Sequence, residues 1–249
     1  MKARSEWISA AAAGEAALPA MARLRGWLRP ILAVALKDLR IERRSKEVIN
    51  AAFSFALVVL LLFSFAFDPS AEETRTLSGG LLWVVYSFCG ALALNRGFAR
   101  ETQHDCLDAL TASPASGSAI FLGKALANAV LLLALEVATL PIFTVFYNVR
   151  WEAGFWWLAL VFPLATWGFA VVGTMFSILT VNVQLRELML PLLVFPITVP
   201  VLMAAVELTT TVFSGQPLAE DWAWLRLLIG FDVIFTTLSA ALAEVVLVG

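Results

Sequence analysis

The chain has 249 residues, of which 61% are hydrophobic and only 14% are charged, and its formal net charge at pH 7 is −2. Its mean hydropathy of +0.86 lies outside the range of soluble domains, so the sequence predicts a membrane protein rather than a soluble enzyme or a nucleic-acid-binding protein. The two cysteines, Cys89 and Cys106, have no CxxC or His-rich spacing, which argues against a disulfide framework and a structural metal site.

The first 30 residues contain no apolar stretch of the kind that forms a signal peptide, and we expect a weakly ordered cytosolic extension there. The next segment, PILAVALKDLRIERRSKEVIN, has the apolar period of an amphipathic helix lying in the inner membrane interface. Its basic face carries Lys37, Arg40, Arg43 and Arg44. Two interpretations stay open: a topology anchor that follows the positive-inside rule, or an elbow helix that also braces a cytosolic partner.

Six apolar segments follow in chain order. A spanning helix needs about 20 mostly apolar residues, because lipid offers the backbone amides no hydrogen-bond partners. The segments that meet this length are residues 51–67, 77–94, 120–146, 155–181, 188–206 and 225–248. The fifth contains Pro191, Pro196 and Pro200, and we expect it not to pack as one uninterrupted helix. The predicted fold class is all-α, with one six-span domain over residues 31–249.

Residues 95–118 form a polar interlude between the second and third apolar segments and contain the only histidine, His104. We expect a short helix over Arg96–Leu110, stopped before Pro114, and a following helix capped by Ser118. A folded amphipathic hairpin finds no other element in this small chain to cover its apolar side, so the sequence predicts a cytosolic docking surface. The alternative is a solvated face.

No catalytic constellation is recognisable in the interlude. His104, Asp105 and Cys106 are neighbours in sequence, but adjacent residues on a helix point about 100° apart and cannot form a catalytic pair. The stretch Gly117–Ala125, GSAIFLGKA, resembles a phosphate-binding loop, yet it has five residues between its glycines and Ala125 where a hydroxyl must meet magnesium. We therefore expect no catalytic residue, no covalently bound cofactor and no metal site. If transport is driven by ATP, hydrolysis takes place on a separate polypeptide.

Basic residues predict the orientation in the membrane. Of the 17 Lys and Arg residues, only Arg75, Arg150 and Arg226 fall on one side of the predicted bilayer. Because short cytosolic connections are enriched in Lys and Arg, the other side is cytosolic. We therefore expect both termini and the interlude to lie in the cytosol.

Glu136 and Asp232 are the two carboxylates that fall well inside apolar segments. A charge in the bilayer interior costs several kcal/mol unless it is paired, hydrated or neutralised, so each is a candidate functional residue. By residue count they lie ten and seven residues from the non-cytosolic ends of their segments, and they could share a cavity. They either line a transport route or contact a partner subunit, or each is a neutral acid bonded to a neighbouring helix.

Three stretches carry a resemblance to a known family. ALKDLRIERRSKEVINAAFSFALVVLLLF, GGLLWVVYSFCGALALNRGFARETQHDCLDALTASPASGSAIFLGKALAN and LVFPITVPVLMAAVE resemble the haem exporter protein B family, the permease subunit of the ABC transporter used in cytochrome c maturation. The resemblance runs from about Leu32 to the C-terminus. Its most specific part is the basic lead-in with the first span, followed by the pattern L-N-R-x-F…D…L…L…S-P…K.

The resemblance implies a six-span ABC-2 type permease in the bacterial inner membrane, present as a homodimer with a dedicated ATPase subunit and with haem-handling membrane partners. Haem is then the implied cargo, and ATP binds the partner subunit. The 95–118 hairpin resembles a coupling helix seated on the ATPase, and the basic N-terminal segment resembles an elbow helix. The residues expected at the ATPase contact are Arg100, Glu101, His104, Asp105, Leu107 and Leu110.

Alternatives remain at the level of function. The complex could release a haem-loaded chaperone rather than move haem. The chain could also be an ABC-2 permease for a drug, a lipid or a glycan, or a membrane scaffold that holds haem-assembly factors together without transport. A scaffold would tolerate disruption of the coupling hairpin as long as the complex formed, whereas a permease would not.

Overall fold

The computed structural model describes residues 20–67, 72–102, 115–149, 154–180, 186–216 and 221–248. All regular structure in these ranges is helical, so the predicted all-α class is confirmed for them. The helices are α2 (Ala20–Ser45), α3 (Glu47–Ala66), α4 (Glu72–Thr102), α6 (Gly117–Phe146), the short 3-10 helix η1 (Phe155–Trp157), α7 (Leu158–Leu179), α8 (Arg186–Phe213) and α9 (Trp222–Val248).

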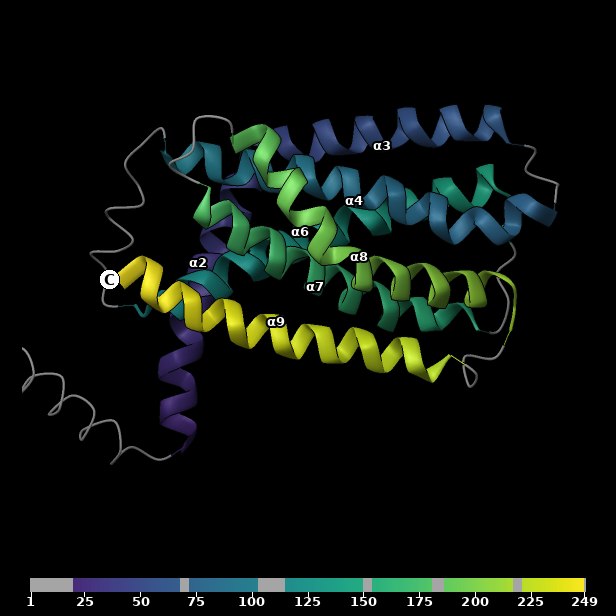
Figure 1. Cartoon of the computed structure of the whole chain (residues 1–249). Coiled ribbons are helices and arrows are strands. Elements are labelled where there is room, and N and C mark those ends of the chain that lie inside the picture. Colours follow the sequence, from purple (N-terminus) through teal and green to yellow (C-terminus); the bar gives the residue numbers. More distant parts are fainter. Residues whose placement is uncertain are drawn as a thin grey trace, which may run out of the picture.

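Six of the helical segments are long and apolar enough to cross a membrane, which confirms the predicted number of spans. They are Glu47–Ala66, Thr76–Asn95, Gly117–Phe146, Phe155–Leu179, Met189–Phe213 and Trp222–Val246. These helices lie side by side as a bundle, and α2 crosses one end of it, where the C-terminus also lies (Figure 1). More than half of the α4 and α7 spans is buried, but less than a third of the α3 and α9 spans. The protein is therefore a multi-pass membrane protein with α4 and α7 at its centre.

An aromatic cluster holds the middle of the bundle together. Trp83, Tyr86 and Phe162 contact one another edge to face, with ring centroids 5.6 to 5.8 Å apart. The Trp83 indole N–H donates to the Thr209 hydroxyl at 2.9 Å, which links α4 to α8. Edge-to-face geometry places the positive ring edge on the negative ring face, so these contacts add specificity to the apolar packing.

Helix α8 corrects one expectation. It is continuous from Arg186 to Phe213 although it contains three prolines. Pro196 and Pro200 are exposed, whereas Val194 and Val201 are buried against the bundle. The rings of Pro196 and Pro200 therefore lie on the outer face of α8, whereas Pro191 is half-buried. Membrane helices tolerate prolines because neighbouring helices, Ser and Thr side chains and local adjustments satisfy the backbone groups that proline frees.

Helix α2 starts earlier than the sequence predicts. It begins at Ala20 and passes through Pro30, so it takes in residues that we expected to belong to a weakly ordered extension. Its far end turns sharply into α3 at Lys46, whose φ of 52° is left-handed. The Glu42 carboxylate accepts hydrogen bonds from the backbone N–H groups of Val48 at 2.9 Å and Ile49 at 3.1 Å. This cap satisfies donors that the first turn of α3 leaves open.

We predict that Thr209→Val lowers the free energy of unfolding by about 1–2 kcal/mol, because it leaves the buried Trp83 N–H without an acceptor. Thermal unfolding of the detergent-purified protein, followed by circular dichroism, measures the effect. Thr237→Val is the matched control, since the exposed Thr237 hydroxyl bonds only to carbonyls of its own helix. Equal losses in the two variants would show that the link between Trp83 and Thr209 contributes nothing specific.

Candidate functional site

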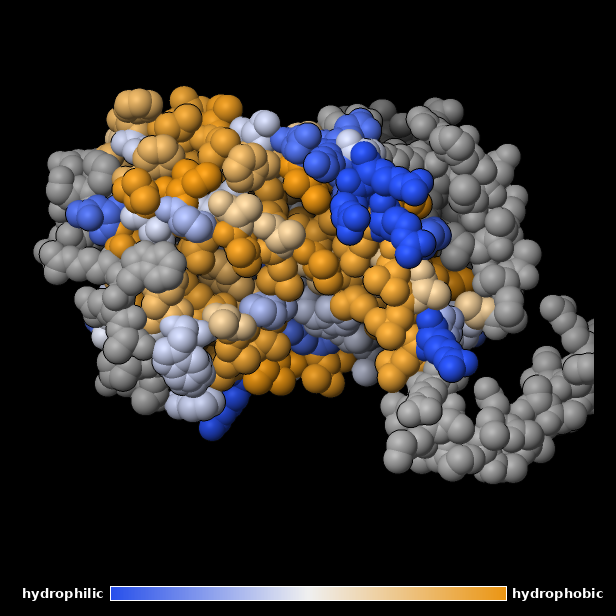
Figure 2. All heavy atoms as spheres, turned by 180° about the vertical axis from the view of Figure 1, so that it is seen from behind, coloured by the Kyte–Doolittle hydropathy of each residue, from blue (hydrophilic) through white to orange (hydrophobic). Residues whose placement is uncertain are grey.

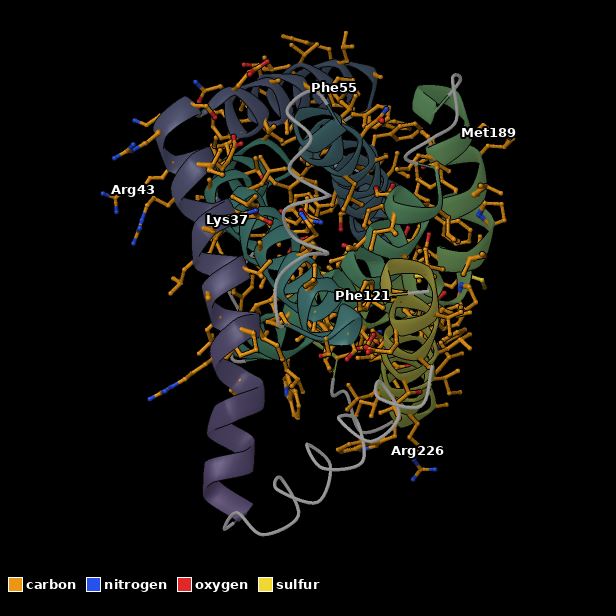
Figure 3. The ribbon with its side chains drawn as sticks, turned by 90° about the vertical axis from the view of Figure 1, so that its left-hand side faces the viewer. Lys37, Arg43, Phe55, Phe121, Met189 and Arg226 are labelled. Carbon is orange, nitrogen blue, oxygen red and sulfur yellow. The ribbon has the colours of Figure 1, made fainter. Side chains whose placement is uncertain are left out.

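The start of α6 contacts both α2 and the end of α9. Figure 3, which views the bundle from the end that α2 crosses, shows α2 along its side. The N-cap of α6 is Ser116, whose hydroxyl accepts from the Ala119 N–H at 3.3 Å. We expected Ser118 as the cap. Instead, the Ser118 backbone N–H donates to the Glu244 carboxylate of α9 at 2.8 Å. A carboxylate at a helix N-terminus also meets the positive end of the helix dipole, so α9 is tied to the first turn of α6.

Helix α2 packs closely on the second turn of α6. A Cβ atom placed on Gly123 would lie 2.7 Å from the Val34 Cβ and 2.8 Å from the Ile31 carbonyl oxygen. Both distances are shorter than van der Waals contact, so only glycine permits this approach. Small residues at helix contacts are the usual way in which membrane helices come close enough for extensive dispersion contacts.

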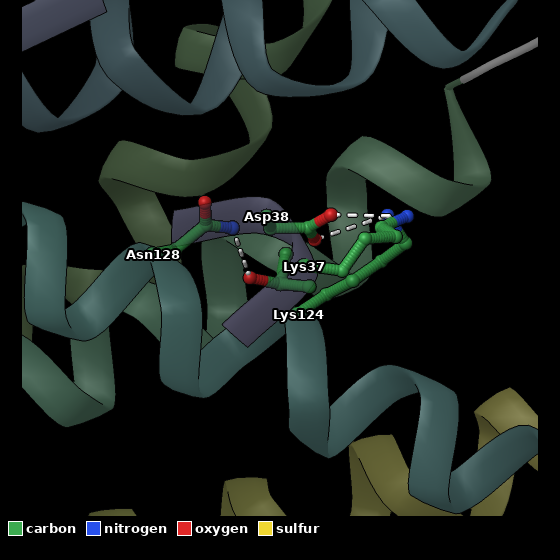
Figure 4. Close-up of polar contacts among 5 residues, drawn as sticks. Lys37, Asp38, Lys124 and Asn128 are labelled. Carbon is green, nitrogen blue, oxygen red and sulfur yellow. Dashed lines mark hydrogen bonds and ion pairs between the residues drawn. The ribbon is translucent and has the colours of Figure 1, made fainter. Parts of the chain in front are cut away.

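An ion pair lies beside this contact (Figure 4). The Lys124 ammonium, on a side chain that is only 5% exposed, is 3.6 Å from one oxygen of Asp38 on α2. Lys37 contacts the other oxygen of Asp38 at 3.0 Å. One turn further along α6, the Asn128 amide donates to the Thr174 hydroxyl of α7 at 2.9 Å. A nearly buried ammonium is strongly destabilised when its counter-charge is removed, so Asp38 fixes α2 to α6.

We call Asp38, Ser118, Gly123, Lys124 and Glu244 together the α6 junction. It joins α2, α6 and α9 at a point that directly follows the segment 103–114 in the chain. These residues connect the start of α6 to both neighbouring helices through close packing and two charged contacts. The geometry can transmit movement but contains no group arranged for chemistry on a substrate.

The residues predicted at the ATPase contact lie at the edge of what the structure describes. Arg100 and Glu101 belong to the last turn of α4, which continues to Thr102 instead of ending at the membrane boundary. The expected separate helix over 96–110 therefore begins as an extension of the second span. His104, Asp105, Leu107 and Leu110 lie outside the described residues, so the docking role stays a prediction.

The predicted elbow residues Lys37, Arg40, Arg43 and Arg44 are all exposed on α2. Figure 3 shows Arg43 directed away from the bundle. The opposite face of α2 buries Ile31, Val34 and Ala35. The structure therefore has the amphipathic helix that the sequence predicts, with its apolar face on α6 and its basic face outward.

Glu136 lies inside the bundle between α4, α6, α7 and α8, and it is 3% exposed. Its two carboxylate oxygens are 2.7 and 2.8 Å from the hydroxyl of Thr166 on α7. The Tyr86 hydroxyl donates to the Glu136 backbone carbonyl at 3.1 Å. The carboxylate borders a cavity of about 10 Å³, enough for roughly one water molecule.

Asp232 on α9 has a different environment. It is 7% exposed, and neither of its carboxylate oxygens has a hydrogen-bond partner among the described residues. It faces Gly168 of α7, where an added Cβ would lie only 2.6 Å from the nearer Asp232 oxygen. A buried carboxylate without donors is costly, so Asp232 stays a candidate functional residue.

The two carboxylates do not share a cavity, contrary to our expectation. Thr166, which bonds to Glu136, and Gly168, which faces Asp232, are two positions apart on α7 and so point about 200° apart around its axis. They are nevertheless at matched depth. Glu136 precedes the end of α6 by ten residues, and Asp232 follows the start of α9 by ten, because α9 begins at Trp222. Both therefore lie roughly 15 Å from the same end of the bundle.

The sequence did not predict which residues bond to one another at the α6 junction and at Glu136. Lys124 was visible as a lone cation two turns into an apolar helix, directly after Gly123, but the sequence does not say that Asp38 meets it. Thr166 gave no signal, because a threonine in a membrane helix usually bonds its own backbone. Glu244 likewise had no marker for its contact with the start of α6.

The fold is that of a multi-pass helical membrane protein, in which an N-terminal helix that crosses one end of the bundle is fixed to the third span. Comparison with known proteins gives the family: residues 29–248 match the model of the CcmB protein family, and the chain belongs to it.

The chain is 29% identical over 211 residues to heme exporter protein B of Rhodobacter capsulatus, covering 85% of this chain and 96% of that protein. It is 30% identical over 176 residues to heme exporter protein B of Paracoccus denitrificans, covering 70% and 80%. It is 27% identical over 207 residues to heme exporter protein B of Pseudomonas aeruginosa, covering 83% and 92%.

We predict that Asp38→Asn lowers the free energy of unfolding by about 1–2 kcal/mol, since it leaves the nearly buried Lys124 ammonium beside a neutral amide. Lys37→Gln removes a cation from the same carboxylate but at a side chain that is 41% exposed, where the loss is expected to stay below about 0.5 kcal/mol. Chemical unfolding in detergent compares the two. A larger loss for Lys37→Gln would contradict the assignment of Asp38 as the partner of Lys124.

Proposed function

We propose that this chain is the membrane permease subunit of an ABC transporter complex that exports haem, or releases a haem-loaded chaperone, during c-type cytochrome biogenesis. The single observation that carries the proposal is the match to the CcmB protein family over residues 29–248, which covers all six spans and α2 from Arg29 onward. Relatives named heme exporter protein B extend over most of the chain at 27 to 30% identity. The complex would lie in the bacterial inner membrane, with both termini in the cytosol.

ATP would be hydrolysed on a separate subunit. The segment between α4 and α6 is the proposed docking site for that ATPase, with Arg100, Glu101, His104, Asp105, Leu107 and Leu110 as contacts. Helix α4 ends and α6 begins at the end of the bundle where α2 and the C-terminus also lie (Figure 1), which supports this assignment. We further propose a homodimer of permeases that assembles with haem-handling membrane partners on the opposite side.

The α6 junction would convert ATPase movement into movement of spans. Closure of the ATPase pushes the segment before α6, and Gly123, Lys124 and Ser118 pass the displacement to α2 and α9. Interfaces packed this closely shift as units instead of deforming continuously. A partner-driven change between two arrangements of the bundle requires such a rigid connection.

The size of the cavity at Glu136 bears on the cargo. A cavity that holds about one water is far below the roughly 300–1,000 Å³ of sites that enclose ligands of drug size. Haem passage beside Glu136 would therefore need α4, α6, α7 and α8 to separate. Release of a haem-loaded chaperone does not need that separation, so this observation favours the chaperone alternative. A permease for a drug, lipid or glycan and a scaffold without transport remain the competing functions.

The first test is deletion of the gene in its host. We expect loss of all covalently bound c-type haem in membrane and periplasmic fractions, with non-covalent b-type cytochromes intact as the control. Wild type restores the signal. Unchanged c-type cytochromes would discard the haem assignment and leave a permease for another cargo.

Gly123→Val tests the junction in the same host. The added side chain separates α2 from α6, and we expect the yield of c-type cytochrome to fall about 2- to 30-fold, the range over which mutations usually change coupling. Gly230→Val is the matched control, because a Cβ at Gly230 meets nothing within 4 Å. Immunoblots must show equal membrane levels. Full activity of Gly123→Val would favour a scaffold or a junction without a role in coupling.

We also propose that Glu136 and Asp232 act in the transport cycle. Glu136→Gln and Asp232→Asn keep the size of each side chain but remove its capacity to carry charge, and each is expected to lower c-type cytochrome yield by about tenfold if a protonation change or a hydrated carboxylate is needed. Thr166→Val is the comparison variant, since it removes the hydroxyl beside Glu136 but leaves the carboxylate. Intact activity of both carboxylate variants would disprove this role.

A further inference from the structure

The outward face of α2 carries a basic groove beside the α6 junction, with which it shares the contact between Lys37 and Asp38. Lys37, Arg40 and Arg44 line it together with Leu36 and Ile41, and the groove has a volume of about 370 Å³. At 100° per residue the three cations fall within an arc of about 60°, with Leu36 on one side of the arc and Ile41 on the other. The groove is thus a stripe of positive charge bordered by apolar side chains.

One of the three cations of the groove, Lys37, contacts the Asp38 carboxylate at 3.0 Å, whereas the two arginines differ. In the part of the chain that the structure describes, Arg40 and Arg44 form no ion pair. Leu36 is 57% exposed and Ile41 is 48% exposed. Guanidinium groups stay charged at all physiological pH values and bind phosphate oxygens with paired donors. The bordering leucine and isoleucine would be exposed to water if the ligand were a small soluble anion.

The groove lies at the edge of the hydrophobic surface of the bundle, where a lipid headgroup is expected. Figure 2 shows hydrophilic side chains gathered at one end of a broad hydrophobic surface, the end where α2 crosses the bundle. This is the boundary between the apolar belt of the spans and the aqueous phase. A ligand there can place an anionic group on the arginines while its apolar part extends along the belt.

We propose that the groove on the outer face of α2 binds the headgroup of an anionic phospholipid, with its phosphate on Arg40, Arg44 and Lys37 and its acyl chains against Leu36 and Ile41. The observation is independent of the cargo and of the partner ATPase. A bound lipid would hold the outer face of α2 at the membrane surface while Asp38 and Gly123 hold its inner face on α6.

The test uses the full-length protein in non-ionic detergent. Thermal unfolding is followed by tryptophan fluorescence while mixed micelles containing dioleoylphosphatidylglycerol or dioleoylphosphatidylcholine are added. A ligand that binds only the folded state raises Tm in proportion to the logarithm of its concentration over its Kd. We expect the anionic lipid to raise Tm and the zwitterionic lipid to have little effect. The Arg40→Gln/Arg44→Gln variant should bind the anionic lipid about tenfold or more weakly.

The control is Arg43→Gln/Arg226→Gln, which removes the same charge from exposed arginines outside the groove. It should keep the wild-type shift. A full shift in Arg40→Gln/Arg44→Gln, or an equal loss in the control, would overturn the site. If sodium phosphate alone raised Tm as much as the anionic lipid, the ligand would be a soluble anion. That result would also overturn the proposal. If the double variant does not fold, the single variant Arg44→Gln is compared with Arg43→Gln by the same criteria.

Discussion

The close contact between α2 and α6 is the constraint on which the rest of this structure depends. A nearly buried ammonium at Lys124 must have a counter-charge, and the chain supplies it from Asp38 on a helix that crosses the bundle instead of running along it. Gly123 makes room for that helix. The start of the third span is thereby fixed to α2 on one side and, through Glu244, to the last span on the other. A movement of the start of α6 would therefore also act on α2 and α9.

The interior follows a second rule, that polar groups in a membrane bundle stay where another helix can reach them. Trp83 reaches Thr209, Asn128 reaches Thr174 and Glu136 reaches Thr166, so hydroxyl groups of neighbouring spans satisfy three inward polar side chains. Asp232 breaks the rule among the described residues. Asp232 lies at the same depth as Glu136 but on the other face of α7. The two carboxylates therefore have different helices as neighbours. A rearrangement of α7 would change the environment of both at once.

Sequence predicted the elements well where the signal is local. Apolar segments of sufficient length identify the six spans, because hydrocarbon demands helices with internally satisfied amides, and the apolar period identifies α2. Local rules failed where packing decides. The prolines of α8 suggested a break, but the helix is continuous, with Pro196 and Pro200 on its outer face. The cap of α6 is Ser116, and the backbone N–H of Ser118 instead meets Glu244 of a distant helix. Asp38 and Lys124 are far apart in sequence, and only the fold brings them together.

The most direct test of the account is a double-mutant cycle on Asp38→Lys and Lys124→Glu, read out as covalently bound c-type haem at equal membrane levels of each variant. If the contact between α2 and α6 carries the movement, each single variant places like charges together and loses activity, while the double variant restores the opposite charges and recovers most of it. The coupling term of the cycle separates this from independent damage. Losses that simply add in the double variant would contradict the account, because the contact would then have no role in function.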